Sequence, residues 1–176
     1  MTKCLIESLL MYFPDQSVLS YDEFVHEDEK GMDLCSHLYD YDENLVKETY
    51  TYISRSWTEI YWPAIADVGG AGSDAWMLPM FLNKKSFIHS FPSLLNFVST
   101  MPSVCEGNIT GCEMLVDNFI DQLNLNEVRQ EWKRNLYFSL DEKVKKIVGF
   151  ILSNETRSLY AQDALDSYWC QFVETL

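Results

Sequence analysis

The stretch SLDEKVKKIVGFIL, residues 139–152, indicates the fold class of this chain most clearly. Its apolar residues are spaced by three and one, which places them on one face of an α-helix; they are Val144, Ile147, Val148, Ile151 and Leu152. Ser139 and Glu142 have the spacing of a capping box, in which a hydroxyl and a carboxylate bind free N–H groups at a helix start. The polar face is expected to hold Lys143, Lys145 and Lys146. The stretch predicts an amphipathic helix that packs on a larger core.

The N-terminal third shows the same helical period. Apolar residues from Leu5 to Phe13 form one helical face, and Pro14 ends that helix. Ser20–Glu23 and Ser56–Glu59 have the pattern of two further capping boxes. Between them, apolar residues over 45–53 predict another helix.

Glycines and prolines divide the middle of the chain. Val68–Ser73, VGGAGS, is the clearest break. Pro79 is expected to kink or restart the helix that follows. Pro92 is placed at the start of the next helix, and Pro102 just after its end.

The last third is the most regular part. Thr110 is expected to cap one helix, Asn126 to begin another, and a final helix is expected from Leu159 to Phe172. Alternating patterns typical of strands are scarce. We therefore predict a mainly α fold: a single domain over residues 1–176, built as an orthogonal bundle of about seven to nine helices.

The chain is strongly acidic, and the excess charge lies near the N-terminus. It has 27 acidic and 13 basic residues and a formal net charge of −14. Residues 1–67 contain 14 acids and 4 bases, a net charge of −10, whereas residues 68–176 have a net charge of −4. Residues 21–48, the acidic block, hold ten acids and two lysines. The hydrophobic content of 47% excludes a disordered acidic chain, because such chains lack the apolar surface to form a core.

Composition also restricts the partners and the compartment. Binding DNA or RNA requires Lys and Arg to replace phosphate counterions, so the net charge argues against nucleic acid. It argues equally against an anionic membrane surface. The start of the chain lacks the pattern of a secretory signal, and five scattered cysteines are typical of reduced thiols. We therefore expect a cytoplasmic protein, whose oligomeric state the sequence leaves open.

No motif predicts catalysis, a metal or a cofactor. His26 lies near Glu23 and Glu27, but their order is not that of H-E-x-x-H, and the second histidine is missing. Cys105 and Cys112 have neither a zinc spacing nor a redox spacing. The glycines of 69–72 lack the lysine and the spacing of a P-loop. The carboxylates lie in charged runs, which are usually solvated, so we expect no enzyme, no metal and no cofactor.

The acidic block allows two interpretations. Its carboxylates and aromatic side chains can dock onto a basic cleft, with charge raising the association rate and aromatic rings serving as buried anchors. Alternatively, the block is only a solvated charged face. The residues assigned to docking are Asp22, Glu23, Glu27, Asp28, Glu29, Asp33, Tyr39, Asp40, Tyr41, Asp42 and Glu43. They belong to a segment, residues 15–55, that is interpreted as a partner-binding addition.

Three motifs follow one another in the C-terminal two-thirds of the chain. They are AWMLPMFL at residues 75–82, FSLDEKVKKIVGF at 138–150 and A-x-x-A-L-x-x-Y-W at 161–169. Their order, LP-x-F-L … F-x-L … A-L-x-x-YW, resembles that of a family of small uncharacterised bacterial proteins, immunity-type or accessory products of toxin loci. The resemblance covers roughly residues 57–170 and implies no catalytic residue. The shared large residues are expected to be core anchors: Trp76, Phe81, Phe150 and Trp169.

Two functional hypotheses follow from the resemblance and the acidic block. The first is a cytoplasmic immunity protein that binds a cognate toxin and occludes its active site through the acidic surface. The second is an acidic cytosolic secretion chaperone or adaptor that binds an extended effector segment in apolar grooves. The type of partner separates them, because a chaperone binds an unfolded segment and an inhibitor binds a folded toxin domain.

Overall fold

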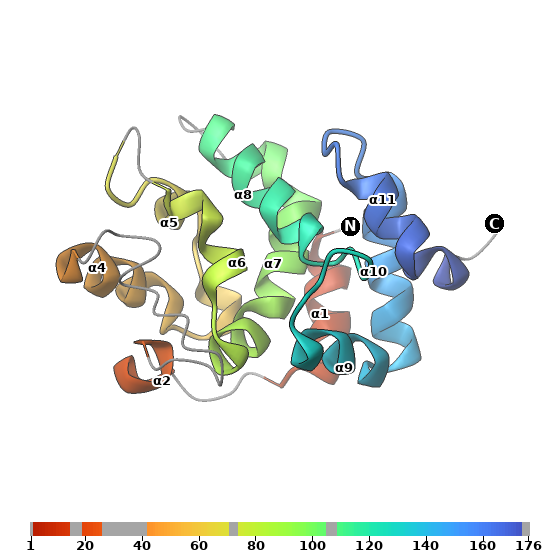
Figure 1. The fold of residues 1–176 in the computed structure, drawn as a ribbon, viewed down its shortest axis with the longest axis horizontal. Helices are drawn as coiled ribbons and strands as arrows, with labels where there is room; N and C mark the ends of the chain where they lie inside the picture. Colours follow the sequence, from red (N-terminus) through yellow and green to blue (C-terminus); the bar gives the residue numbers. More distant parts are fainter. Residues whose placement is uncertain (1, 15–18, 26–41, 71–73, 105–108, 174–176) are drawn as a thin grey trace.

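Helices and their connections make up the described part of this chain, which a computed structural model defines for residues 2–14, 19–25, 42–70, 74–104 and 109–173 (Figure 1). No strand occurs among these residues. The α-helices are α1 (Thr2–Tyr12), α2 (Tyr21–Val25), α4 (Glu43–Ile53), α5 (Trp62–Ala66), α6 (Leu78–Phe81), α7 (Lys84–Val104), α8 (Ile109–Asp121), α9 (Glu131–Ser139), α10 (Glu142–Asn154) and α11 (Ala161–Ser167). Three 3₁₀ turns accompany them: η1 (Trp57–Glu59), η2 (Ala75–Met77) and η3 (Trp169–Phe172).

The predicted mainly α fold is confirmed, because the described helices form one compact body. The described ranges hold ten α-helices, where seven to nine are predicted. The difference arises from α2, α5 and α6, which span only four or five residues each. Such short helices depend on packing for their stability, since isolated helices of this length do not form in water.

Helix α7 is the centre of the fold. It lies between α4 and α5 on one side and α9, α10 and α11 on the other (Figure 1), and it contacts α1, α2, α5, α8 and α10. Phe87 and Phe91 of α7 are fully buried and pack against Phe119 of α8 and Tyr137 of α9, with ring centroids 6.0 to 6.5 Å apart. Because aromatic side chains bury large apolar areas, this cluster is a major source of hydrophobic stabilisation.

The bounds of α7 differ from those that its prolines predict. Asn83 caps its start, since the side-chain oxygen accepts a hydrogen bond from the Ser86 N–H at 2.9 Å. The helix then continues through Pro92 and Pro102 to Val104. The prediction of a start at Pro92 and an end before Pro102 is therefore wrong. A proline inside a helix removes one hydrogen bond, and the burial of α7 among so many neighbours outweighs that loss.

Two predicted helix starts are also corrected. Asp141, and not Ser139, caps α10: its carboxylate accepts from the Lys143 N–H at 2.8 Å, and Ser139 is the last residue of α9. Helix α9 begins at Glu131 instead of Asn126, because residues 122–128 form hydrogen-bonded turns before it. The Ser139 hydroxyl donates to the Leu136 carbonyl within α9, and the Asn126 N–H donates to the Asn124 side chain within the turns.

The faces of α10 are partly different from those predicted. Lys145 is buried and not on the polar face, and its ammonium donates to Glu142 at 3.0 Å. Phe150 has 51% of its surface exposed, so it is not a core anchor. Trp169, by contrast, is confirmed as a fully buried anchor, and Trp76 and Phe81 are half-buried.

Close packing at Gly149 explains this orientation of α10. A Cβ atom at this position would lie 3.1 Å from the carbonyl oxygen of Trp169 in η3. The predicted final helix is divided, because Tyr168, with φ −162° and ψ −36°, separates α11 from η3. This break lets Trp169 enter the core, where its Nε1–H donates to the Leu123 carbonyl at 2.8 Å.

Candidate functional site

The two described ends of the acidic block lie against each other. Helix α2 comes from its start and α4 from its end. Tyr50 of α4 contacts Tyr21 and Phe24 of α2, with ring centroids 5.1 and 5.8 Å apart. Five of the ten acids of the block belong to these two parts: Asp22, Glu23, Asp42, Glu43 and Glu48. The fold thus gathers them at one end of the molecule, away from α10 and α11 (Figure 1).

Residues at the start of α7 hold α2 in place. The Asn83 side-chain amide donates to the carbonyls of Glu23 at 2.8 Å and Phe24 at 3.1 Å, while its oxygen caps α7. Lys85 Nζ lies 3.1 Å from the Glu23 carboxylate. One asparagine therefore satisfies backbone groups at the end of one helix and at the start of another. The position of α2 is tied to the central helix.

Glu23 has a structural role in addition to its charge. Its carboxylate accepts hydrogen bonds from Ser20 N–H at 3.1 Å and Ser20 Oγ at 2.9 Å, and the Glu23 N–H donates to Ser20 Oγ at 3.3 Å. The predicted capping box is confirmed. The bonds from Ser20, followed by the Lys85 ion pair, lower the pKa of Glu23 from 4.5 to about 2. Glu23 is therefore fully charged near neutral pH, but that charge already has partners.

The other predicted docking residues fall into two groups. Asp42 caps α4 through the Asn44 N–H at 2.9 Å, Glu43 pairs with Lys47 at 3.3 Å, and Asp22 is exposed on α2. The remaining residues lie outside the described residues, so their placement stays a prediction: Glu27, Asp28, Glu29, Asp33, Tyr39, Asp40 and Tyr41. Asp42, like Glu23, contributes to the local fold as well as to the surface charge.

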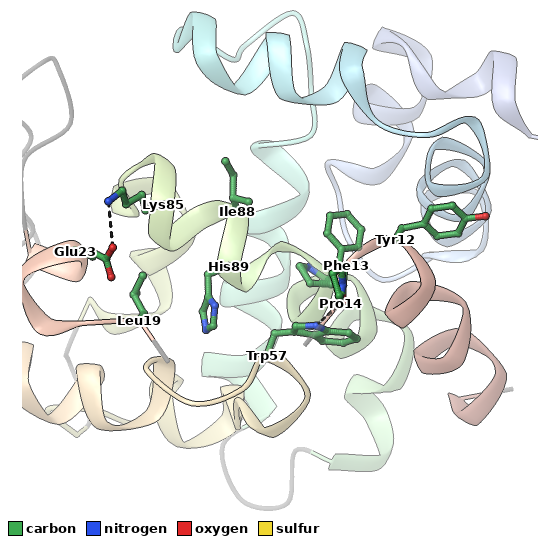
Figure 2. Close-up of a pocket in the computed structure, with 10 residues that line it drawn as sticks. Tyr12, Phe13, Pro14, Leu19, Glu23, Trp57, Lys85, Ile88 and His89 are labelled. Carbon is green, nitrogen blue, oxygen red and sulfur yellow. Dashed lines mark hydrogen bonds and ion pairs between the residues drawn. The ribbon is translucent and has the colours of Figure 1, made fainter. Parts of the chain in front are cut away.

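A cavity of about 430 Å³ opens beside this acidic end (Figure 2). Its walls come from the end of α1, from α2 and the residues before it, from η1 and from α7, namely Tyr12, Phe13, Pro14, Leu19, Glu23, Trp57, Lys85, Ile88, His89 and Pro92. The Glu23–Lys85 pair lies at one side of the cavity and Tyr12 at the opposite side (Figure 2). The walls are largely apolar with charge at one edge, which is typical of sites that bind an apolar or aromatic group.

Backbone contacts fix the two ring systems that line the middle of the cavity. The Trp57 Nε1–H donates to the Phe13 carbonyl at 3.0 Å, and His89 Nε2 lies 2.8 Å from the Arg55 carbonyl. Because a carbonyl only accepts, Nε2 of His89 carries a proton in this contact. Glu23 is a poor general base near neutral pH, since its pKa is about 2. The arrangement suits binding better than acid–base catalysis.

The sequence gives only an indirect signal of this cavity. Ser56, predicted to begin a second capping box, caps the 3₁₀ turn η1 through the Thr58 N–H at 3.3 Å and does not start an α-helix. From the sequence, Pro14 and Pro92 are predicted only to be helix boundaries. That these positions and Trp57 line one cavity depends on how α1 and η1 pack on α7, which no local pattern specifies.

Two further features are absent from the described ranges. Within them, no helix is both long and apolar enough to cross a bilayer. No group of three or more His, Cys, Asp or Glu side chains there is arranged to hold a metal ion. His26 lies outside the described residues, so its expected lack of a metal role stays a prediction.

No family model, curated protein or solved structure matches this chain. The resemblance to immunity-type bacterial proteins therefore stays a prediction from the three motifs. Function has to be inferred from the charge, the acidic end and the cavity.

Proposed function

We propose that this protein is a bacterial immunity protein, which binds a cognate toxin and blocks its active site by covering a basic cleft with the acidic end. The main support is the contact of α2 with α4 through Tyr50, which gathers both described parts of the acidic block. Like charges brought together raise the local negative potential and favour encounter with a basic surface. Inhibition then requires no catalysis, because occlusion of the toxin's active site is enough.

The anchoring of α2 favours a surface that is formed before binding. Five residues are too few for a helix that is stable alone, yet Asn83 and Lys85 fix this one on α7. A surface that is already ordered loses less conformational entropy on binding. Asp22, which is exposed on α2, would then meet the partner in a defined position.

The cavity supplies the apolar element that such an interface needs. Interfaces derive most of their affinity from a few buried aromatic or arginine side chains, and rim charges add mainly rate and specificity. An aromatic or aliphatic side chain of the toxin would enter between Trp57 and Pro92, with the Glu23–Lys85 pair at the edge. If the toxin acts on nucleic acid, the exposed carboxylates would occupy its phosphate-binding positions.

Co-expression with the product of a neighbouring gene tests this proposal. We expect the neighbour to arrest growth when it is produced alone, and this protein to restore growth through a complex that weakens at high salt. The variant Asp22→Asn, Glu43→Gln, Glu48→Gln removes three exposed charges of the acidic end. We expect it to weaken the complex by roughly ten- to a hundredfold.

A charge-matched control separates this surface from net charge. The variant Glu113→Gln, Asp163→Asn, Asp166→Asn also removes three exposed acids, but from α8 and α11. It should bind as tightly as the unaltered protein. Equal weakening by the two variants, or a complex that neither affects, would contradict the acidic end as the toxin-binding surface.

The cavity also favours a second candidate, the secretion chaperone or adaptor. An extended effector segment would place apolar side chains in the cavity between Phe13, Leu19 and Trp57. Such a protein would bind an isolated unfolded segment, and its binding would depend little on salt. Binding of a synthetic effector segment, without binding of the folded effector domain, would favour this candidate over the immunity protein.

A further inference from the structure

One face of α10 combines basic and aromatic side chains in a protein that is otherwise acidic. Lys143, Lys146 and Phe150 are spaced by three and four residues, so they follow one another along one helical face. All three are exposed, and half of the Phe150 surface faces solvent. We call these three residues the Lys–Phe strip. The strip thus places an exposed aromatic ring one turn beyond two lysines, and Phe is one of the residue types enriched at interaction surfaces.

The charge around the Lys–Phe strip has the opposite sign to that of the whole chain. Among the exposed residues of 129–157, five are basic and three are acidic, a net charge of +2, because Lys133, Lys145 and Glu155 are buried; the chain as a whole is −14. On α9, Arg134 and Phe138 are also exposed, one turn apart. The surface therefore fits an acidic partner with an apolar component.

The acidic and basic surfaces lie toward opposite ends of the longest axis of the molecule. Helices α2 and α4 are at one end and α10 is toward the other (Figure 1). They are too far apart within one molecule for the charges to neutralise each other by contact. A second molecule whose acidic end docked on α10 would bring its acids against the Lys–Phe strip.

From this arrangement we infer that the protein self-associates head to tail, the acidic end of one copy docking on the Lys–Phe strip of another. The occupant is a second copy because its acidic end has the charge that the strip requires, and Tyr21 and Tyr50 lie among those acids. Such a contact joins two different surfaces, so it generates chains or rings instead of a closed twofold dimer. The inference does not depend on the proposed function.

Nearby acids and the net charge oppose this association and define its conditions. Asp141 and Glu142 are exposed at the start of α10, and Asp163 and Asp166 are exposed on α11, which lies toward the same end as α10 (Figure 1). Two chains of −14 also repel each other at long range. At an ionic strength of about 0.1 M, charges more than about 10 Å apart are largely screened, whereas contacts across an interface persist. Association is therefore expected to be strongest near this salt concentration and weaker near 1 M.

Sedimentation equilibrium of the full chain over a wide range of concentration tests the inference. We expect oligomers whose mass rises with concentration at about 0.1 M salt, and an association constant at least about tenfold lower near 1 M. Lys146→Gln should weaken association, while Lys84→Gln, an exposed lysine on α7 with the same change in net charge, should not. Circular dichroism would verify that both variants remain folded.

A mixing experiment distinguishes a head-to-tail contact from other modes. One variant lacks the strip (Lys143→Gln, Lys146→Gln, Phe150→Ser), and the other lacks three acids (Asp22→Asn, Glu43→Gln, Glu48→Gln). Each should be monomeric alone. Their mixture should form a one-to-one dimer and nothing larger, because only one complementary pair of surfaces remains.

Three outcomes would overturn the inference. The first is an unaltered protein that sediments as a monomer at every concentration near 0.1 M salt. The second is association that the strip variant leaves unchanged, which would place the interface elsewhere. The third is two variants that remain monomeric when mixed although the unaltered protein associates, which would exclude pairing of these two surfaces.

Discussion

The acidic end, formed by α2 and α4, and the C-terminal end, from α9 to η3, are held together by different contacts. At the acidic end, hydrogen bonds from Asn83 and Tyr50 hold short helices on the body. At the C-terminal end, Tyr137 and Trp169 are fully buried with ring centroids 5.6 Å apart. Helix α2 buries only Phe24, whereas α10 buries six residues, and regions with fewer buried contacts open at lower free energy than a packed core. The acidic end is thus expected to be the more dynamic of the two.

The two ends also differ in where their charged side chains lie. Acids of α2 and α4 stay at the surface, but at the C-terminal end the Lys133 ammonium is fully buried. It donates to the Gln122 side chain at 2.7 Å and lies 4.5 Å from the centre of the Phe87 ring. Tyr137 donates to the Gln122 carbonyl at 2.7 Å, and burial raises the pKa of its hydroxyl. Charge is exposed at one end and is part of the interior at the other.

The largest effect is expected from the core of the C-terminal end. Trp169→Ala would remove a fully buried ring and leave the Leu123 carbonyl without its indole donor. We expect a loss of about 3–5 kcal/mol in the free energy of unfolding, measured by urea denaturation. Trp169→Phe, which keeps an aromatic ring in place, should lose less. A loss under about 1 kcal/mol for the alanine variant would contradict a tightly packed core at this end.

A smaller effect is expected where the acidic end joins α7. Asn83→Ala removes both the cap of α7 and the donor to α2, so we expect a loss of about 1–2 kcal/mol. Hydrogen exchange should show faster opening of α2 than of α10. Asn83→Asp keeps an acceptor for α7 but removes the donor to α2. It should therefore loosen α2 alone, and an unchanged α2 in both variants would show that other contacts hold it.

Local patterns were sufficient to predict most of the helices and one of their caps. The period of three and four residues locates α1, α4 and α10, and Ser20 and Glu23 form their capping box because both partners lie within one turn. The wrong predictions concern which other elements a helix packs against. Phe150 follows Gly149 by one residue and so points about 100° away from it. Since η3 packs at Gly149, Phe150 is left at the surface.

Of the candidate site, only the acidic charge could be predicted from the sequence. Counting acids identifies residues 21–48, but it does not show that Tyr50 joins the two described ends of this block. Nor does it show that Glu23 and Asp42 act as caps that support the fold. The cavity draws its residues from positions between 12 and 92, so it exists only once α1, η1 and α7 have packed. Long-range contacts of this kind leave no local pattern.

The pH dependence of stability offers a test of the Ser20–Glu23 box. The pKa of Glu23 falls from 4.5 to about 2 on folding, so its contribution is complete above pH 4.5 and is lost as the pH falls toward 2. Because this side chain is exposed to solvent, we expect a smaller effect than for Trp169 or Asn83. Urea midpoints of Glu23→Gln and the unaltered protein should therefore converge between these pH values. A difference that stays constant down to pH 2 would show that the charge of Glu23 is not what stabilises α2.

The smallest effect on stability is expected for Asp121, which lies nearer the C-terminal end. Its substitution should stabilise the protein, whereas the substitutions above destabilise it. Burial, followed by repulsion from Glu127, raises the pKa of Asp121, and attraction by Lys133 lowers it in part. A carboxyl group with a raised pKa binds its proton more tightly in the folded state than in the unfolded state. Its ionised form is therefore unfavourable for folding above the raised pKa, and this penalty disappears as the pH falls and the group becomes protonated. Asp121 is also the last residue of α8, where a negative charge opposes the helix dipole.

We therefore expect Asp121→Asn to raise the free energy of unfolding near neutral pH by about 0.5 kcal/mol. The gain should vanish in acid, where Asp121 is protonated in both states. Glu127→Gln is the matched control, since it relieves the repulsion and keeps the carboxylate at the helix end; it should give a smaller gain. A less stable Asp121→Asn protein would mean that attraction to the buried Lys133 outweighs burial and repulsion at this position. Acidic residues would then stabilise the C-terminal end as well as the acidic end. The two ends would still differ in how their helices are packed.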